Sequence, residues 1–190
     1  QDRGYDEVNL NLGCPSGTVV SKGKGSGMLR DLNALDQFLE EIFAASPVPV
    51  SVKTRLGLED PGEFPAILEI YNRYPIKELT VHPRVRKAFY KGDVHMDAFR
   101  FCAETSKIPL CYNGNLNCLA DIEGFSKDYP QVGAVMIGRG LVGDPGMLIP
   151  GGTTKDALQA FSDGLLESYT EVFGSQRNAM FRLKENWHFL

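Results

Sequence analysis

A strand pattern that ends in a cysteine turn reads Asn9-Leu10-Asn11-Leu12-Gly13-Cys14-Pro15-Ser16. Polar and apolar residues alternate over Glu7–Leu12, which predicts a strand, and Gly13-Cys14-Pro15 predicts a turn at its end. In parallel α/β folds, ligands and reactive groups gather at the carboxyl ends of the strands. The position of Cys14 therefore favours chemistry over packing.

Four more strands are predicted downstream, each short, rich in apolar and β-branched residues, and bounded by Gly, Pro or Asn. They cover Val48–Arg55, Glu78–His82, Pro109–Asn113 and Ala134–Ile137. Helical segments lie between them, over Asp31–Ala45, Ala66–Tyr74, Asp97–Ser106 and Leu119–Tyr129. Single helices between successive strands predict βα units with a parallel sheet, which is an α/β fold.

The pattern changes after Pro150-Gly151-Gly152. Two helices, Thr154–Phe173 and Arg177–Leu190, are predicted there with no strand between them. We therefore expect an α/β domain over residues 1–150 and the beginning of a helical domain over residues 151–190.

Composition excludes several classes of protein. The net charge is −4 at pH 7, so any nucleic-acid surface has to be a local patch. No apolar run approaches the ~18 residues of a membrane span, and no signal-peptide pattern is visible. The four cysteines include no CxxC pair, and Cys111 and Cys118 lack a His or Cys at zinc-ligand spacing. These features predict a cytoplasmic protein without a membrane segment or a metal site.

Polar residues stand at the carboxyl end of every predicted strand. They are Asn11 and Cys14, Lys53 and Arg55, His82 and Arg84, Asn113-Gly114-Asn115, and Gly138-Arg139-Gly140. Together they describe a cup of polar groups at one end of a parallel barrel. The glycines after the last two strands could simply form tight turns, but their pairing on successive strands with Arg139 favours a phosphate site.

Three of these residues have more than one interpretation. Cys14 is a small buried hydrophobe, a nucleophile without a His or Cys nearby in sequence, or a proton donor. Lys53 either extends to water from a strand end or contacts an electron-rich cofactor. His82 is either a hydrogen-bonded structural residue or a cofactor ligand.

Two basic segments follow these strands. Ser16–Met28 contains four glycines together with Lys22 and Lys24, which is typical of a mobile substrate loop. The second segment carries Arg84, Arg86, Lys87 and Lys91, with Phe89 and Tyr90 between the charges. A charge run alone is usually a solvated loop, but cations interleaved with aromatic residues suit RNA.

The assembled motifs resemble the tRNA-dihydrouridine synthase family over roughly residues 5–148. The matching elements are Asn-Leu-Gly-Cys-Pro-Ser (11–16), Val-Lys-Thr-Arg-Leu-Gly (52–57), Val-His-Pro-Arg (81–84) with Tyr90-Lys91-Gly92, Asn-Gly-Asn (113–115), and Met-Ile-Gly-Arg-Gly (136–140) with Asp144-Pro145. The resemblance implies an FMN-dependent oxidoreductase on a TIM barrel, followed by a helical domain. It also implies that NADPH is the reductant and that the C5–C6 bond of uridine in tRNA is reduced.

The resemblance also assigns roles to individual residues. Cys14 matches the general acid that protonates the uracil ring. The flavin contacts match Lys53, His82, Asn113, Gly114, Asn115, Gly138 and Arg139. Asn11, Lys22, Lys24, Arg55, Arg84, Arg86 and Lys87 are expected to face the tRNA.

Two other functions fit the residues. One is another FMN-barrel oxidoreductase, of the dihydroorotate dehydrogenase type, and the other is a non-catalytic RNA-binding module. The resemblance further implies that about five of eight barrel strands are present, with the first three strands of the family missing before Gln1.

Overall fold

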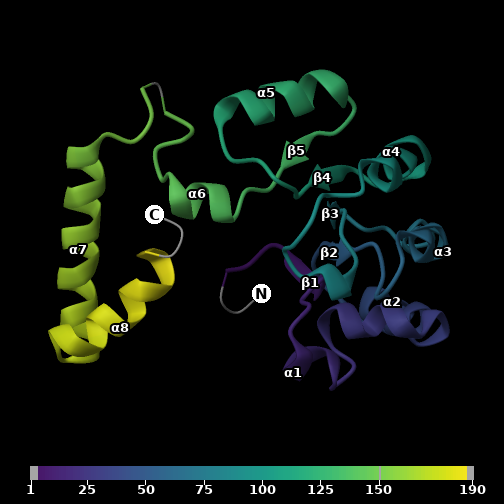
Figure 1. Cartoon of the computed structure of the whole chain (residues 1–190). Helices are drawn as coiled ribbons and strands as arrows, with labels where there is room; N and C mark the ends of the chain where they lie inside the picture. The colour runs from purple at the N-terminus through teal and green to yellow at the C-terminus, as the bar shows by residue number, and fades with distance from the viewer. Residues whose placement is uncertain (1–3, 150, 188–190) are drawn as a thin grey trace. The chain divides into compact units, whose positions relative to one another are not determined.

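Five parallel strands form one sheet in the computed structural model, which describes residues 4–149 and 151–187 (Figure 1). They are β1 (Val8–Leu12), β2 (Val50–Arg55), β3 (Leu79–His82), β4 (Leu110–Tyr112) and β5 (Ala134–Val135). Each strand pairs with the next one along the chain, in the order β1-β2-β3-β4-β5. Sequential parallel strands joined by helices are the pattern of a (β/α) barrel. The predicted α/β fold, as part of a TIM barrel, is confirmed.

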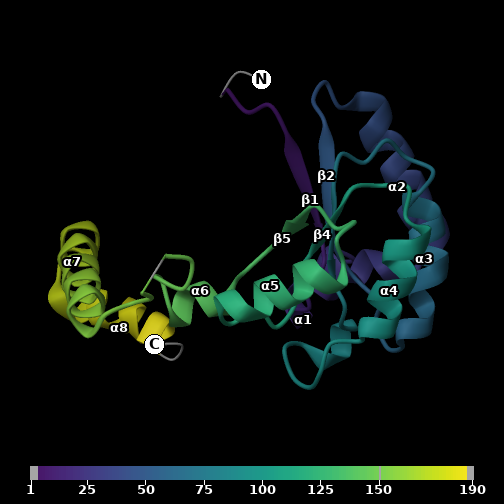
Figure 2. The same cartoon turned by 90° about the horizontal axis from the view of Figure 1, so that it is seen from above.

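The chain divides into two compact units. The first comprises Gln1–Gly114 and Asp128–Met136, and it contains the whole sheet. Its helices are α1 (Gly17–Val20), α2 (Leu32–Ala45), α3 (Phe64–Tyr71) and α4 (Met96–Thr105), with 3₁₀ turns η1 (Gly25–Arg30), η2 (Pro61–Glu63) and η3 (Arg86–Ala88). In Figure 2, α2, α3 and α4 stand on one side of the strands. Buried apolar side chains such as Leu39, Val52, Ile67, Val81 and Phe99 form the core of this unit.

Local sequence explains where two of these helices begin. Asp31 caps α2, because its carboxylate accepts hydrogen bonds from Asn33 N at 3.0 Å and Ala34 N at 3.1 Å. Asp60 and Glu63 form a capping box around η2, which leads directly into α3. This box is the reason that α3 begins at Phe64, two residues before the predicted start.

The second unit comprises Asn115–Lys127 and Ile137–Leu190. It contains α5 (Leu119–Asp128) except its last residue, together with α6 (Arg139–Gly143), α7 (Lys155–Phe173) and α8 (Gln176–Trp187). Thr154 caps the start of α7, and Gly174 ends it with a φ of +71°. None of the helices in the described part of the chain combines the length and apolarity needed to span a bilayer.

The predicted elements are all present with small shifts at their ends, except that residues 188–190 of the last helix lie outside the described residues. Two short helical elements, α1 and η1, occupy the segment Ser16–Met28, which the sequence predicts to be a loop. Helix α6 follows the Gly138 turn and was not expected either. The domain boundary predicted at residue 150 stays a prediction.

Candidate functional site

The two faces of the sheet differ in chemistry, because side chains alternate along each strand. In the parallel register, Lys53 lies opposite Asn11 and Thr80, and Arg55 lies opposite His82. One face is therefore polar, whereas the other presents apolar residues to α2, α3 and α4. The polar face comprises Asn9, Asn11, Ser51, Lys53, Arg55, Thr80, His82 and Cys111.

Asn11 shapes the cysteine turn at the end of β1. Its Oδ1 atom accepts hydrogen bonds from Gly13 N at 3.1 Å and from Cys14 N at 3.1 Å. This is an Asx turn, in which a side chain replaces a backbone acceptor. Cys14 itself is partly exposed. The turn thus fixes the backbone of Cys14 and leaves the residue accessible from solvent.

A second segment holds the same turn from its other end. Ser26 is fully buried, and it donates both its backbone N–H, at 3.0 Å, and its hydroxyl, at 2.8 Å, to Cys14 O. Gly25 has a φ of +57°, and a Cβ atom there would lie 2.8 Å from Cys14 Cβ. Only glycine allows this approach. The segment Ser16–Met28 is therefore folded against Cys14.

Arg55 connects the cysteine turn to the loop after β3. Its guanidinium donates from Nε to Gly13 O at 2.9 Å and from Nη1 to Val85 O at 3.1 Å. The ring centroid of Tyr90 lies 5.3 Å from its central carbon, within the range of a cation–π contact. Burial lowers the pKa of Arg55, and nearby Tyr90 and Cys14 act in the opposite direction. Arg55 is thus a buried cation beside the thiol.

Lys53 places a second positive charge on the polar face. Burial lowers the pKa of this lysine, and the charge of Arg55 lowers it further, whereas Cys111 acts in the opposite direction. Two half-buried or buried cations two residues apart on one face create a positive potential. Such a potential favours an anionic or electron-rich ligand over this part of the sheet.

His82 and Arg84 form a hydrogen-bonded pair at the end of β3. Nη1 of Arg84 lies 2.9 Å from Nε2 of His82. A guanidinium can only donate, so Nε2 accepts and the ring proton is on Nδ1. Arg84 also donates to Gly92 O at 2.6 Å, and both side chains are buried. Arg84 thereby braces His82 and closes the loop that follows it.

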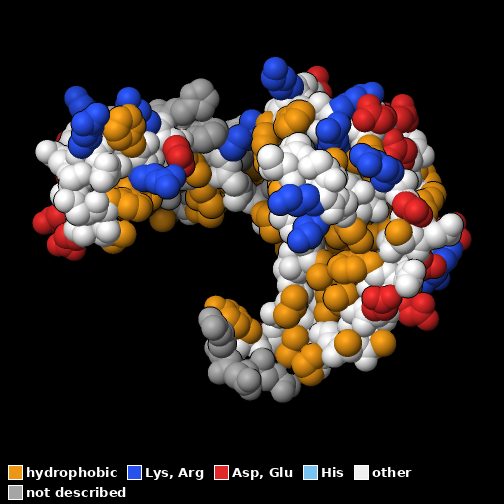
Figure 3. All heavy atoms as spheres, turned by 90° about the horizontal axis from the view of Figure 1, so that it is seen from below, with side chains coloured by type: hydrophobic (Ala, Val, Ile, Leu, Met, Phe, Trp, Pro, Cys, Tyr) orange, Lys and Arg blue, Asp and Glu red, His pale blue; other side chains and the backbone are white. Residues whose placement is uncertain are grey.

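The other predicted RNA contacts lie on the two loops. Lys22 and Lys24 are exposed. Arg86 and Lys87 share one carboxylate, that of Glu59, at 3.8 Å and 3.7 Å. Figure 3 shows basic side chains standing among acidic ones on the unit that contains the sheet, so its surface is not uniformly positive.

The predicted phosphate site is divided between the two units. Asn113 and Gly114 belong to the first unit, and the Asn113 amide donates to Met136 O at 2.8 Å. Asn115, Gly138 and Arg139 belong to the second unit. Their joint contact with a phosphate stays a prediction.

Sequence reasoning missed several residues that hold the site. Ser26 bonds Cys14 across twelve positions, which no local pattern signals. The sequence predicts Tyr90 as an aromatic residue of a basic loop and part of a family motif, and not as the partner of Arg55. Glu63 accepts from Leu58 N, Glu59 N and Asp60 N, at 2.9, 2.8 and 2.8 Å. The Asp-Pro-Gly-Glu sequence at 60–63 was a readable signal for this last role.

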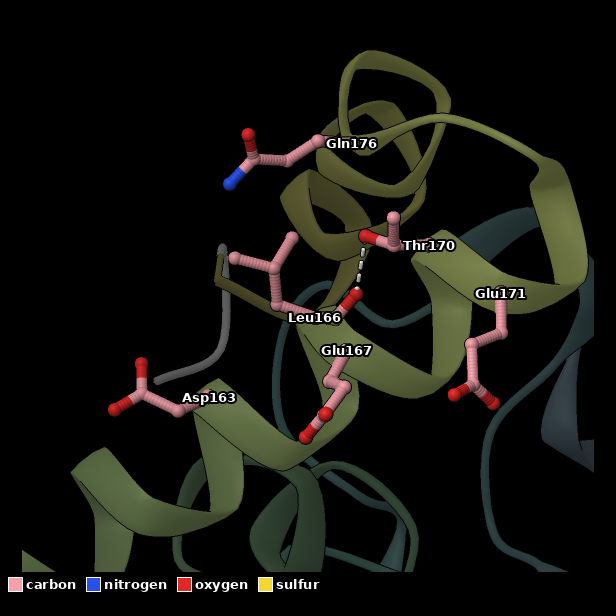
Figure 4. Close-up of a pocket in the computed structure, with 6 residues that line it drawn as sticks. All are labelled: Asp163, Leu166, Glu167, Thr170, Glu171 and Gln176. Carbon is pink, nitrogen blue, oxygen red and sulfur yellow. Dashed lines mark hydrogen bonds between the residues drawn. The ribbon is translucent and has the colours of Figure 1, made fainter.

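Two further features of the described residues bear on the choice of site. They contain no group of three or more His, Cys, Asp or Glu side chains that could hold a metal ion. A hollow of about 370 Å³ lies in the second unit, between α7 and the start of α8 (Figure 4). Its lining includes Asp163, Glu167 and Glu171, so its charge opposes the binding of a polyanion.

Comparisons with known proteins show which family this chain resembles. A family model described as dihydrouridine synthase (Dus) matches residues 1–181. The probable tRNA-dihydrouridine synthase of Rickettsia bellii (strain RML369-C) is 33% identical over 182 residues, which cover 90% of this chain and 55% of that protein. The tRNA-dihydrouridine synthase B of Pasteurella multocida (strain Pm70) is 32% identical over 143 residues, or 75% of this chain and 43% of that protein. The chain spans about half the length of the curated relatives it matches.

Proposed function

We propose, because this chain belongs to the dihydrouridine synthase family, that it carries the proton donor and the flavin contacts of a tRNA-dihydrouridine synthase. The enzyme is an oxidoreductase that reduces the C5–C6 bond of uridine in tRNA. The observation that carries the proposal is the partly exposed Cys14, which Asn11 and Ser26 fix at the carboxyl end of a parallel sheet.

The reaction adds a hydride to one carbon of the uracil double bond and a proton to the other. FMN, reduced by NADPH, supplies the hydride when it is bound. Hydride addition at C6 leaves negative charge on C5 and the adjacent carbonyl. The Cys14 thiol gives its proton to C5, and the thiolate regains a proton from water. Arg55 is a buried cation bonded to Gly13 O, in the residue before Cys14, and so lies near the negative charge left by this transfer.

The residues of the polar face suit a flavin. Lys53 provides a positive charge for the electron-rich part of the ring system, and its pKa, lowered by burial and by Arg55, reflects a site that favours an anionic partner. His82 provides an imidazole whose orientation is set by Arg84. We assign these two side chains to the isoalloxazine and ribityl groups, and Asn113, Gly114, Asn115, Gly138 and Arg139 to the phosphate.

The basic residues around the cysteine turn suit a polyanionic substrate. A uridine inside folded tRNA has to leave its stack before it can reach the sheet. We assign Arg55 and Arg84, which are buried, together with Asn11 at the turn, to the side of the site that such an extruded base would approach. We assign the exposed side chains of Lys22, Lys24 and Lys87, with the half-buried Arg86, to contacts with phosphates.

The test is reduction of unmodified tRNA by the purified protein with FMN and NADPH, with dihydrouridine measured by mass spectrometry. We expect activity, a flavin absorbance band at about 450 nm, and a loss of about 100-fold or more in Cys14→Ala. Cys118→Ala is the matched control, since Cys118 is also a free, accessible cysteine. Undiminished activity in Cys14→Ala would remove the thiol from the mechanism. Flavin binding with reduction of a free pyrimidine instead of tRNA would favour the dihydroorotate dehydrogenase type, and tRNA binding without flavin a non-catalytic module.

A further inference from the structure

The loop after β3 contains a tight turn with an unusual residue in it. Lys91 N donates to Ala88 O at 2.8 Å, which closes a four-residue turn over 88–91. Phe89, at its first central position, has φ of +50° and ψ of −103°. These angles approach those of a type II′ turn, where that position is normally glycine. Phe89 is the only non-glycine residue with positive φ among the described residues.

Neighbouring contacts hold the turn in this conformation. Arg86 N donates to Gly57 O at 2.9 Å, and Lys87 N donates to Leu58 O at 3.1 Å. At the other end of the loop, Arg84 binds Gly92 O at 2.6 Å. A strained backbone persists only where the surroundings over-determine it, and such strain concentrates at functional positions. The loop thus keeps a bulky side chain where glycine would relieve the strain.

The strain has a visible result, which is that an aromatic ring is presented to solvent. Phe89 is 45% exposed and Tyr90 is 53% exposed. Tyr90 faces Arg55, whereas Phe89 has no aromatic or cationic partner among the described residues. Lys91, next to this pair, has no carboxylate within ion-pair distance in the described part of the chain. An exposed ring beside an uncompensated cation has the chemistry of a single-strand RNA contact.

We infer that Phe89 is a stacking platform for an unpaired RNA base that flanks the target uridine, with Lys91 meeting the adjacent phosphate. The inference rests on the proposed function, since it requires tRNA as the substrate. The location of Phe89 is suitable because Arg55 connects its loop to the cysteine turn. Arg55 donates to Gly13 O, next to Cys14, and to Val85 O, at the start of the loop that carries Phe89. A base stacked on Phe89 would hold the strand next to a uridine that has left its stack.

The experiment compares five variants, Lys91→Ala among them, by equilibrium binding of unmodified tRNA at several salt concentrations, with the urea midpoint measured for each. Phe89→Ala removes the ring, Phe89→Tyr keeps it, and Phe89→Gly removes both ring and strain. Phe101→Ala, an exposed aromatic on α4, is the matched control. We expect Phe89→Ala and Phe89→Gly to weaken binding about 5- to 150-fold, and Phe89→Tyr and Phe101→Ala to bind as the wild type does.

Two further readouts separate stacking from a purely structural role. Removing a ring leaves the slope of log K against log salt unchanged, whereas Lys91→Ala reduces that slope by about 0.7 to 0.9. Phe89→Gly should also raise the urea midpoint by about 0.5 M, because glycine relieves the strain. Unchanged tRNA affinity in both Phe89→Ala and Phe89→Gly, in a protein that still reduces tRNA, overturns the inference and leaves the proposed function standing. A wild-type protein that neither binds nor reduces tRNA overturns both.

Discussion

The packing of Gly25 against the cysteine turn leads to a sharp prediction. A Cβ atom at Gly25 would lie 2.8 Å from both Cys14 Cβ and Cys14 O, and 3.0 Å from Val19 Cγ1. Real Cβ atoms do not approach other heavy atoms so closely, so Gly25→Ala has to displace the turn. Gly23 provides a matched control, since its φ of +66° is similar to the +57° of Gly25 but a Cβ atom there would meet nothing within 4 Å.

The two substitutions separate backbone strain from steric displacement. Each places alanine in the left-handed region, which costs about 1–2 kcal/mol. Gly25→Ala adds an overpacking cost of about 1–3 kcal/mol. We therefore expect Gly25→Ala to lower the free energy of unfolding by about 1–3 kcal/mol more than Gly23→Ala does, which urea unfolding would measure.

The same pair of variants tests whether the packing of Gly25 against Cys14 positions the thiol. A displacement of about 1 Å at a reacting group can reduce a rate by about 100-fold. We expect Gly25→Ala to lower kcat for tRNA reduction and to change the rate at which iodoacetamide alkylates Cys14, while Gly23→Ala leaves both close to wild type. Equal urea midpoints and equal alkylation rates for the two variants would refute the reasoning, because they would mean that Gly25 does not contact the turn.

Two other predictions concern side chains that stabilise the loops and the core. Burial alone would raise the pKa of Glu63, but hydrogen bonds from three backbone N–H groups outweigh burial and lower the pKa. The carboxylate therefore contributes to the free energy of unfolding above the ordinary glutamate pKa of about 4.3. This contribution is lost as the pH falls through the lower pKa of the folded state. Glu63→Gln should flatten the acid side of a plot of urea midpoint against pH, and an unchanged plot would contradict this. The hydroxyls of Thr54 and Tyr71 are buried and 2.9 Å apart. Thr54→Val should therefore lower the free energy of unfolding by about 1–3 kcal/mol, because it leaves the tyrosine hydroxyl unsatisfied, and adding Tyr71→Phe should recover part of that loss in thermal unfolding. A double variant as unstable as the sum of the two single variants would refute the pairing.

The order of the elements could be predicted from the sequence because hydrophobic periodicity and turn residues are local signals. The alternation over Glu7–Leu12 and the apolar run that ends at Arg55 marked two neighbouring strands, and the structure pairs them. The convergence of Asn11, Lys53 and His82 followed from parallel topology, since the carboxyl ends of parallel strands lie at one edge. Their register places them on one face of the sheet.

What could not be predicted depends on contacts between distant segments. The glycines of Ser16–Met28 indicated a mobile loop, but Ser26 bonds Cys14 O and the glycine at position 25 permits a close approach there. Sequence patterns report backbone freedom and not the surface on which a segment folds. The charges of Arg86 and Lys87 were read as available for RNA, whereas Glu59 lies within ion-pair distance of both. Carboxylates nearly thirty residues away are invisible to a local count of charges.

Three separate segments hold the cysteine turn, which explains how a glycine-rich stretch of sequence can keep the backbone of Cys14 in one position. Asn11 fixes the turn from the strand before it, Ser26 from the glycine-rich segment after it, and Arg55 from the neighbouring strand through Gly13 O. Each contact ends on a backbone atom, so none of them occupies the cysteine side chain. Arg55 also bonds the loop that presents Phe89. One buried guanidinium therefore contacts both the cysteine turn and the segment that leads into that loop.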